Sequence, residues 1–179
     1  MSPALVLKKD RAELHIPWKI PVADGRGARE RITAESKICS AVFTGQDACT
    51  VCCILDSSGK RESSFYIKGG REYANASRQI YDRIKRSEDV QGGGGNAKAN
   101  YRYWKKLKNL HEHYAHQISR QIINYCKIQN ASILVLPEYN KDYGNIILAS
   151  VGKNSPLRLV PSIREKLKYK AWQEGIVVL

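Results

Sequence analysis

Glu138 is the residue whose position is most typical of chemistry, because it directly follows a segment that reads as a buried strand. Residues 132–136 (Ser-Ile-Leu-Val-Leu) form an almost continuous apolar run, which is typical of a strand covered on both faces. Pro137 cannot donate to a central ladder, so strand pairing is expected to stop there. Glu138 should therefore lie just past the strand's C-terminal end, where ligands and catalytic groups gather in α/β sheets. A carboxylate at that edge is a ligand for a divalent metal ion.

A second concentration of functional residue types lies upstream, in residues 96–129. This segment holds seven Lys and Arg residues against one acid, Glu112. The basic residues are Lys98, Arg102, Lys105, Lys106, Lys108, Arg120 and Lys127. Such residues bind phosphates, and Tyr101, Tyr103 or Trp104 can stack on a base where they are exposed. We therefore expect the segment to bind RNA or DNA with little sequence preference.

The charge of the whole chain agrees with a polyanionic partner. Its 179 residues carry 30 Lys and Arg against 17 Asp and Glu, which gives a formal net charge of +13. A net charge of this size favours binding to nucleic acid. The hydrophobic content of 42% is that of an ordinary globular protein. A basic surface without function is the alternative.

Membrane spans and secretion are not expected. No apolar run approaches the ~18 residues that are needed to span a bilayer. The first residues do not have the pattern of a signal peptide. The five cysteines are an odd number, so a disulfide framework is not expected. We expect an intracellular, cytoplasmic and nucleoid-associated protein without a membrane partner, and its oligomeric state is open.

A long helix is predicted over residues 100–129, because apolar residues recur there in steps of three and four. These residues are Tyr103, Leu107, Leu110, Tyr114, Ile118, Ile122 and Tyr125. Asn130 suits the C-terminal end of the helix, where a residue at positive φ is often needed. Most of the basic residues lie off the apolar stripe, so the helix is expected to bury one face and to present lysines and arginines on another.

The remaining elements are predicted from alternation, turn residues and helix boundaries. Residues 5–17 alternate and predict a hairpin. Three strands are predicted at 37–43, 48–55 and 63–67, helices at 71–85 and from Pro161 to Gly175, and a last strand at 176–179. Tight turns between the three strands predict an antiparallel meander.

The order of these elements predicts an α/β fold with a mixed sheet. The long helical connection predicts that the strand at 132–136 lies parallel to, and beside, the strand at 37–43. This is the arrangement of the ribonuclease H-like fold, in which carboxylates on the first and fourth strands meet near one edge. There they hold divalent metals for phosphodiester cleavage. A generic α/β domain is the alternative.

Several segments also occur in the order and spacing of one known family. They are residues 5–17, 103–110 and 116–122 in and before the long basic helix, Ile133-Leu-Val-Leu-Pro-Glu138, and residues 167–171 and 175–177. In these segments the chain resembles the RuvC-like domain of the transposon-encoded TnpB (OrfB) proteins and of the related type V CRISPR effectors. The likeness covers most of the chain.

The resemblance implies a part of an RNA-guided DNA-targeting protein, with a guide RNA and a target DNA as partners. The family's activity is that of a Mg²⁺-dependent endonuclease. The resemblance also implies two parts in this chain. Residues 1–34 would be the end of a wedge or oligonucleotide-binding-like part, and residues 35–179 a RuvC-like domain that is expected to be truncated at its C-terminus.

The family's acidic set is incomplete in this sequence. Family members carry an Asp two residues before a Gly on the first strand; here Gly45 matches the Gly and Phe43 stands at the Asp position. A phenyl ring cannot bind Mg²⁺. Asp47 lies in the turn after Gly45, and the third acid would lie beyond Leu179. Glu138 alone cannot clamp two metal ions.

Three functions are therefore left open. The first is a nucleic-acid-binding, nuclease-inactive RuvC-like domain, for which no metal cofactor is expected. The second is an active DNA endonuclease that uses Glu138 and Asp47 with Mg²⁺ or Mn²⁺. The third is a structural or assembly module that binds a protein partner.

Overall fold

The computed structural model describes residues 3–8, 12–16, 26–33, 36–90, 100–138 and 152–179. A small hairpin comes first, made of β1 (Ala4–Leu7) and β2 (Ala12–His15), which pair antiparallel as the alternation predicts. A four-residue helix, α1 (Ala28–Arg31), follows. The division into parts at residues 1–34 and 35–179 stays a prediction.

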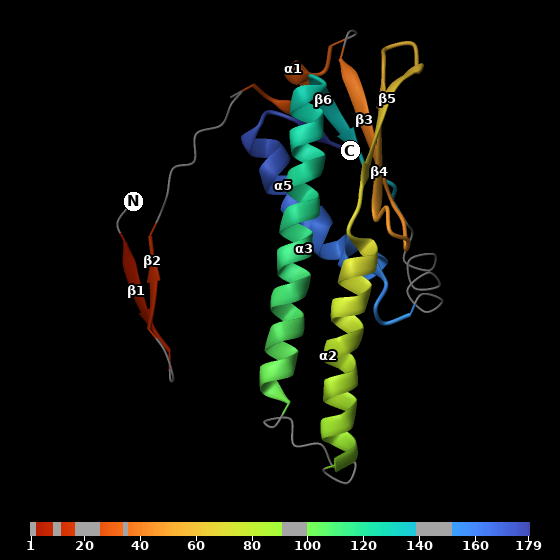
Figure 1. Ribbon diagram of the computed structural model, residues 1–179. Coiled ribbons are helices and arrows are strands. Elements are labelled where there is room, and N and C mark those ends of the chain that lie inside the picture. Colours follow the sequence, from red (N-terminus) through yellow and green to blue (C-terminus); the bar gives the residue numbers. More distant parts are fainter. Residues whose placement is uncertain (1–2, 9–11, 17–25, 34–35, 91–99, 139–151) are drawn as a thin grey trace.

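The centre of the fold is a five-stranded mixed sheet with the order β5-β4-β3-β6-β7 (Figure 1). Strands β3 (Lys37–Phe43), β4 (Thr50–Leu55) and β5 (Arg61–Ile67) form the predicted antiparallel meander. Strand β6 (Ala131–Val135) lies parallel to β3, with Cys39 opposite Leu134, and β7 (Val177–Val178) lies parallel to β6.

This topology confirms the predicted neighbourhood of the two strands that lead to the candidate site. The chain leaves the meander, passes through the helices and returns to place β6 directly beside β3. The mixed sheet with this order is that of the ribonuclease H-like fold.

Two long helices connect the meander to β6. Helix α2 (Gly70–Val90) and helix α3 (Tyr101–Ile128) lie side by side and extend together beyond the sheet (Figure 1). Aromatic side chains hold the pair: the rings of Tyr73 and Tyr114 are 5.3 Å apart, and those of Tyr81 and Trp104 are 6.1 Å apart. Helix α2 continues five residues past the predicted end, because no Gly or Pro interrupts the sequence before Gly92.

The C-terminal segment supplies the second helical cover of the sheet. A 3₁₀ turn, η1 (Pro156–Leu159), leads into α5 (Val160–Gln173), and Pro161 lies in its first turn as predicted. Gly175 then adopts φ 74°, and Asn130 at the end of α3 adopts φ 56°, so both helices end on residues in the left-handed region.

The core lies between one face of the sheet and helices α3 and α5. Its fully buried side chains come from the central strands and from both helices. They include Cys39, Ala41, Cys52, Ile54, Leu134, Ile122, Ile163 and Leu167. None of the helices that the structure describes is both long and apolar enough to cross a membrane.

Candidate nucleic-acid interface

The edge of the sheet where β3 and β6 end brings together only part of an acidic site. Phe43 is the last residue of β3 and is 5% exposed, so an apolar ring packed in the core stands where β3 would have to offer a carboxylate. Glu138 follows β6 by three residues and is exposed to solvent. The end of β3 thus offers no side-chain oxygen that would share a metal ion with Glu138.

Asp47 makes contacts with the first turn of α2. Its backbone carbonyl accepts hydrogen bonds from the N–H groups of Cys49 and Gly70, each at 3.0 Å. Its side-chain Oδ1 accepts one from the N–H of Arg71 at 3.3 Å. A carboxylate at a helix N-terminus satisfies a free backbone donor and is favoured by the helix dipole. In this structure Asp47 therefore has a role in starting α2.

These positions do not fit a two-metal centre. Within the described ranges, no group of three or more His, Cys, Asp or Glu side chains is placed to hold a metal ion. Two-metal hydrolysis requires several carboxylates that bridge and anchor the ions. The catalytic roles considered for Glu138 and Asp47 stay predictions.

The predicted basic residues of α3 lie on its solvent side. Arg102, Lys105, Lys106, Lys108 and Arg120 are all exposed, and Lys98 lies outside the described residues. By the helical period, the side chains of residues 102, 106, 120 and 127 leave the helix within one quadrant. We call the exposed side of α3 that carries these cations the basic face.

The two aromatic residues of the predicted interface are only partly available. Trp104 is 45% exposed and packs edge-on against Tyr81 of α2. Tyr103 is half-buried, and it borders a shallow hollow beside Arg83 and Arg86 of α2. Stacking on a base by either residue stays a prediction.

The structure adds a polar groove between α3 and α5, which we call the α3–α5 groove. It has a volume of about 640 Å³, and its walls include His113, His116, Arg120 and Lys127 from α3 and Lys170 from α5. Sequence analysis had singled out only Arg120 and Lys127 among these residues. The available signal was the spacing of Lys166 and Lys170, which places two lysines on one side of the last helix.

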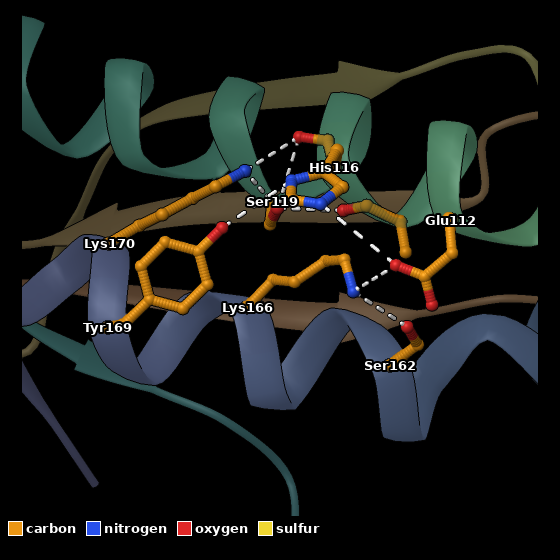
Figure 2. Close-up of polar contacts among 8 residues, drawn as sticks. Glu112, His116, Ser119, Ser162, Lys166, Tyr169 and Lys170 are labelled. Atoms are coloured by element: carbon orange, nitrogen blue, oxygen red, sulfur yellow. Dashed lines mark hydrogen bonds and ion pairs between the residues drawn. The ribbon is translucent and has the colours of Figure 1, made fainter. Parts of the chain in front are cut away.

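A polar cluster between the two helices forms the base of this groove (Figure 2). The Nζ of Lys166 is 2.7 Å from Oε2 of Glu112 and donates to Oγ of Ser162 at 3.2 Å. The Nζ of Lys170 donates to the backbone carbonyl of His116 at 2.9 Å and to Oγ of Ser119 at 2.7 Å. Both lysines thus join α5 to α3.

The pKa values in the cluster indicate a concentration of positive charge. Burial lowers the pKa of His116 below 6.5, and the nearby Lys170 and Lys166 lower it further. Burial also lowers the pKa of Lys170, and Arg120 and Lys166 add to the effect. The hydrogen bond from Lys166 lowers the pKa of Glu112, so this carboxylate stays ionised. Cations that disfavour each other's charge create a site that an anion stabilises.

The ion pair between Glu112 and Lys166 predicts an asymmetric response to mutation. The side chain of Lys166 is 8% exposed and that of Glu112 is 47% exposed. Glu112→Gln leaves a buried ammonium without its carboxylate and should cost about 1–3 kcal/mol of unfolding free energy. Lys166→Met leaves a carboxylate that water can solvate, and we expect a change below about 1 kcal/mol.

Urea unfolding at neutral pH measures both variants. Because the pKa of Glu112 is lowered from 4.5, the stabilisation is complete above that pH and is lost as the pH falls through the lowered value. The difference between wild type and Glu112→Gln should therefore shrink in acid. Equal costs for the two variants at neutral pH would contradict the asymmetry.

His116 provides a second test of the charge in the groove. Lys170→Met keeps a side chain of similar length and removes the positive charge, so the pKa of His116 should rise toward 6.5. An NMR titration of the histidine ring protons measures the shift, with Lys85→Met on α2 as the control. A His116 pKa that does not respond to Lys170→Met, or responds equally to both changes, would show that Lys170 does not act on this ring.

Comparisons with known proteins place the fold. No protein-family model matches the sequence, and no curated protein matches it. Over 93% of this chain, the structure is similar to part of Cas12f1 in a cryo-EM structure of the Cas12f1–sgRNA–target DNA complex, with a TM-score of 0.59 and 12% sequence identity. It is also similar, over the same share of the chain, to part of a CRISPR–Cas12f ternary complex determined by cryo-EM, with a TM-score of 0.52 and 14% identity.

The likeness covers only part of each Cas12f chain. This protein spans 31% of the first and 30% of the second. At these levels of identity, the comparison establishes a common fold. The chain therefore has the ribonuclease H-like fold in a form that is found within a type V CRISPR effector.

Proposed function

We propose that this chain is a nucleic-acid-binding RuvC-like domain of an RNA-guided DNA-targeting protein of the TnpB or type V CRISPR kind. On this proposal its partners are a guide RNA and a target DNA. The observation that carries the proposal is the basic face of α3, which presents exposed cations beside the cationic α3–α5 groove. The similarity to parts of Cas12f chains that were solved with nucleic acid supports it.

We further propose that the chain does not cleave nucleic acid by itself. Phe43 is buried at the end of β3, and Asp47 accepts a hydrogen bond at the start of α2, so Glu138 has no demonstrated acidic partner among the described residues. Mg²⁺ dehydrates reluctantly and gains little from one exposed carboxylate. The domain would serve as a binding surface whose cleavage chemistry is absent or is supplied by other residues.

The binding half of the proposal is tested by the anisotropy of fluorescein-labelled oligo-uridine and oligo-thymidine, titrated with the protein at several NaCl concentrations in EDTA. We expect log K to fall linearly with log salt, by about 0.7 units for each phosphate contacted on a single strand. A protein that binds neither probe at low salt would reject the proposal and leave the structural or assembly module as the better account.

A further inference from the structure

The α3–α5 groove is distinct from the exposed cations in the N-terminal half of α3. It lies along the C-terminal half of α3, where α5 packs beside that helix (Figure 1). The open surface around Lys105 and Lys106 has one wall, the helix itself. The groove has two, so a ligand inside it contacts residues from both helices.

The charge of the groove favours an anion at its centre. Three cations, Arg120, Lys127 and Lys170, line it together with one acid, Glu174. Lys127 and Glu174 form an ion pair at 2.8 Å. The positive charge that remains comes from Arg120 and Lys170, and Arg120 is among the groups that lower the pKa of Lys170. A phosphate between these two cations would relieve their repulsion.

Amide side chains lie beside the cations. Gln117 and Asn124 from α3 and Gln173 from α5 line the same groove. Each amide offers both donors and acceptors, which can pair with the edge of an unstacked base. Cations alone would suit any polyanion, but cations together with amides suit a ligand that alternates phosphates with hydrogen-bonding bases.

The size of the groove limits the form of the nucleic acid. Its volume of about 640 Å³ falls within the ~300–1,000 Å³ of sites that enclose a small ligand. Such a space holds roughly one or two nucleotides. In a duplex the base edges are paired and the two strands are held together, so a duplex can only lie across the opening.

We propose that the α3–α5 groove is a subsite for one or two nucleotides of a single-stranded nucleic acid. Arg120 and Lys170 contact the phosphate, and Gln117, Asn124 and Gln173 contact the base. This inference rests on the proposed nucleic-acid-binding function and adds to it a preference for single strands that is located in one groove.

A variant with little change in shape tests the subsite. Gln117→Glu combined with Asn124→Asp keeps the size of both exposed side chains and adds two negative charges beside Arg120 and Lys170. These charges have cations nearby, so the fold should not lose stability. The matched control is Asn75→Asp with Gln79→Glu, which makes the same exchange at exposed positions of α2. Thermal unfolding checks that both variants are as stable as wild type.

Anisotropy titrations use oligo-uridine, oligo-thymidine and a fully paired RNA duplex of the same length. We expect the groove variant to bind at least one of the single strands about tenfold more weakly than wild type, with a much smaller loss on the duplex. The α2 control should change all affinities by less than about threefold. Larger loss on oligo-uridine identifies RNA as the strand, and larger loss on oligo-thymidine identifies DNA.

Two outcomes overturn the subsite while leaving the proposed function intact. One is wild-type affinity of the groove variant for every probe. The other is an equal loss on single strand and duplex, which would show a general electrostatic effect. Failure of the wild-type protein to bind any probe is a different result, because it rejects the proposed function itself.

Discussion

Replacing Lys105, Lys106 and Lys108 by Ala is expected to flatten the dependence of log K on log salt by about 2–3 units for nucleic-acid binding. All three side chains are exposed on α3. Each cation that contacts a phosphate releases counterions, which contributes about 0.7 units to the slope on single strands and 0.9 on duplex DNA. Because the lost term is electrostatic, affinity should fall most at low salt and least at high salt.

The same anisotropy titrations measure this variant, and a control with equal loss of charge separates local contact from net charge. Lys60, Lys68 and Lys85 are exposed outside α3, so replacing them by Ala removes three charges from other surfaces. We expect the control to keep a slope close to that of wild type. An unchanged slope in the α3 variant would exclude this part of the basic face as a phosphate contact.

Gly70→Ala is expected to destabilise the fold by about 3 kcal/mol or more, since overpacking against fixed backbone costs this much. Gly70 is the first residue of α2, and a Cβ there would overlap the carbonyl oxygen of Gln46 and lie 3.1 Å from that of Asp47. The turn cannot move away cheaply, because the carbonyl of Asp47 accepts hydrogen bonds from the N–H groups of Gly70 and Cys49.

Urea unfolding followed by circular dichroism measures the cost. Gly152→Ala is the control, since a Cβ at Gly152 would meet no atom within 4 Å. We expect its stability to stay within about 0.5 kcal/mol of wild type. A Gly70→Ala variant as stable as this control would show that the turn at Gln46 and Asp47 relaxes freely, and the contact between the turn and α2 would lose its structural importance.

The sheet and its helices were largely predictable from the sequence, because each depends on a local pattern. The period of Leu107, Ile118 and Ile122 defined the buried side of α3, and Asn130 marked its end. The tight turns of the meander and the long crossover to β6 then left few topologies, so the parallel pairing of β6 with β3 followed as well.

The groove and the role of Asp47 were not predictable in the same way, because both depend on contacts between distant segments. Lys166 and Lys170 read only as charges on the last helix, and the structure shows them bonded to Glu112 and Ser119 of α3. Asp47 read as an acid near the sheet edge. Its bond to Arg71 depends on how α2 begins against the turn, which the local sequence does not specify.

One experiment tests the central claim that the chain binds nucleic acid without cutting it. The purified protein is incubated with labelled oligo-thymidine in Mg²⁺ or Mn²⁺, and each sample is divided between a native and a denaturing gel. We predict a shifted band on the native gel and full-length oligonucleotide on the denaturing gel with either metal. Cleavage that is abolished by Glu138→Gln or Asp47→Asn would contradict the account and make this chain a nuclease. Absence of a shift at low salt would contradict it from the other side.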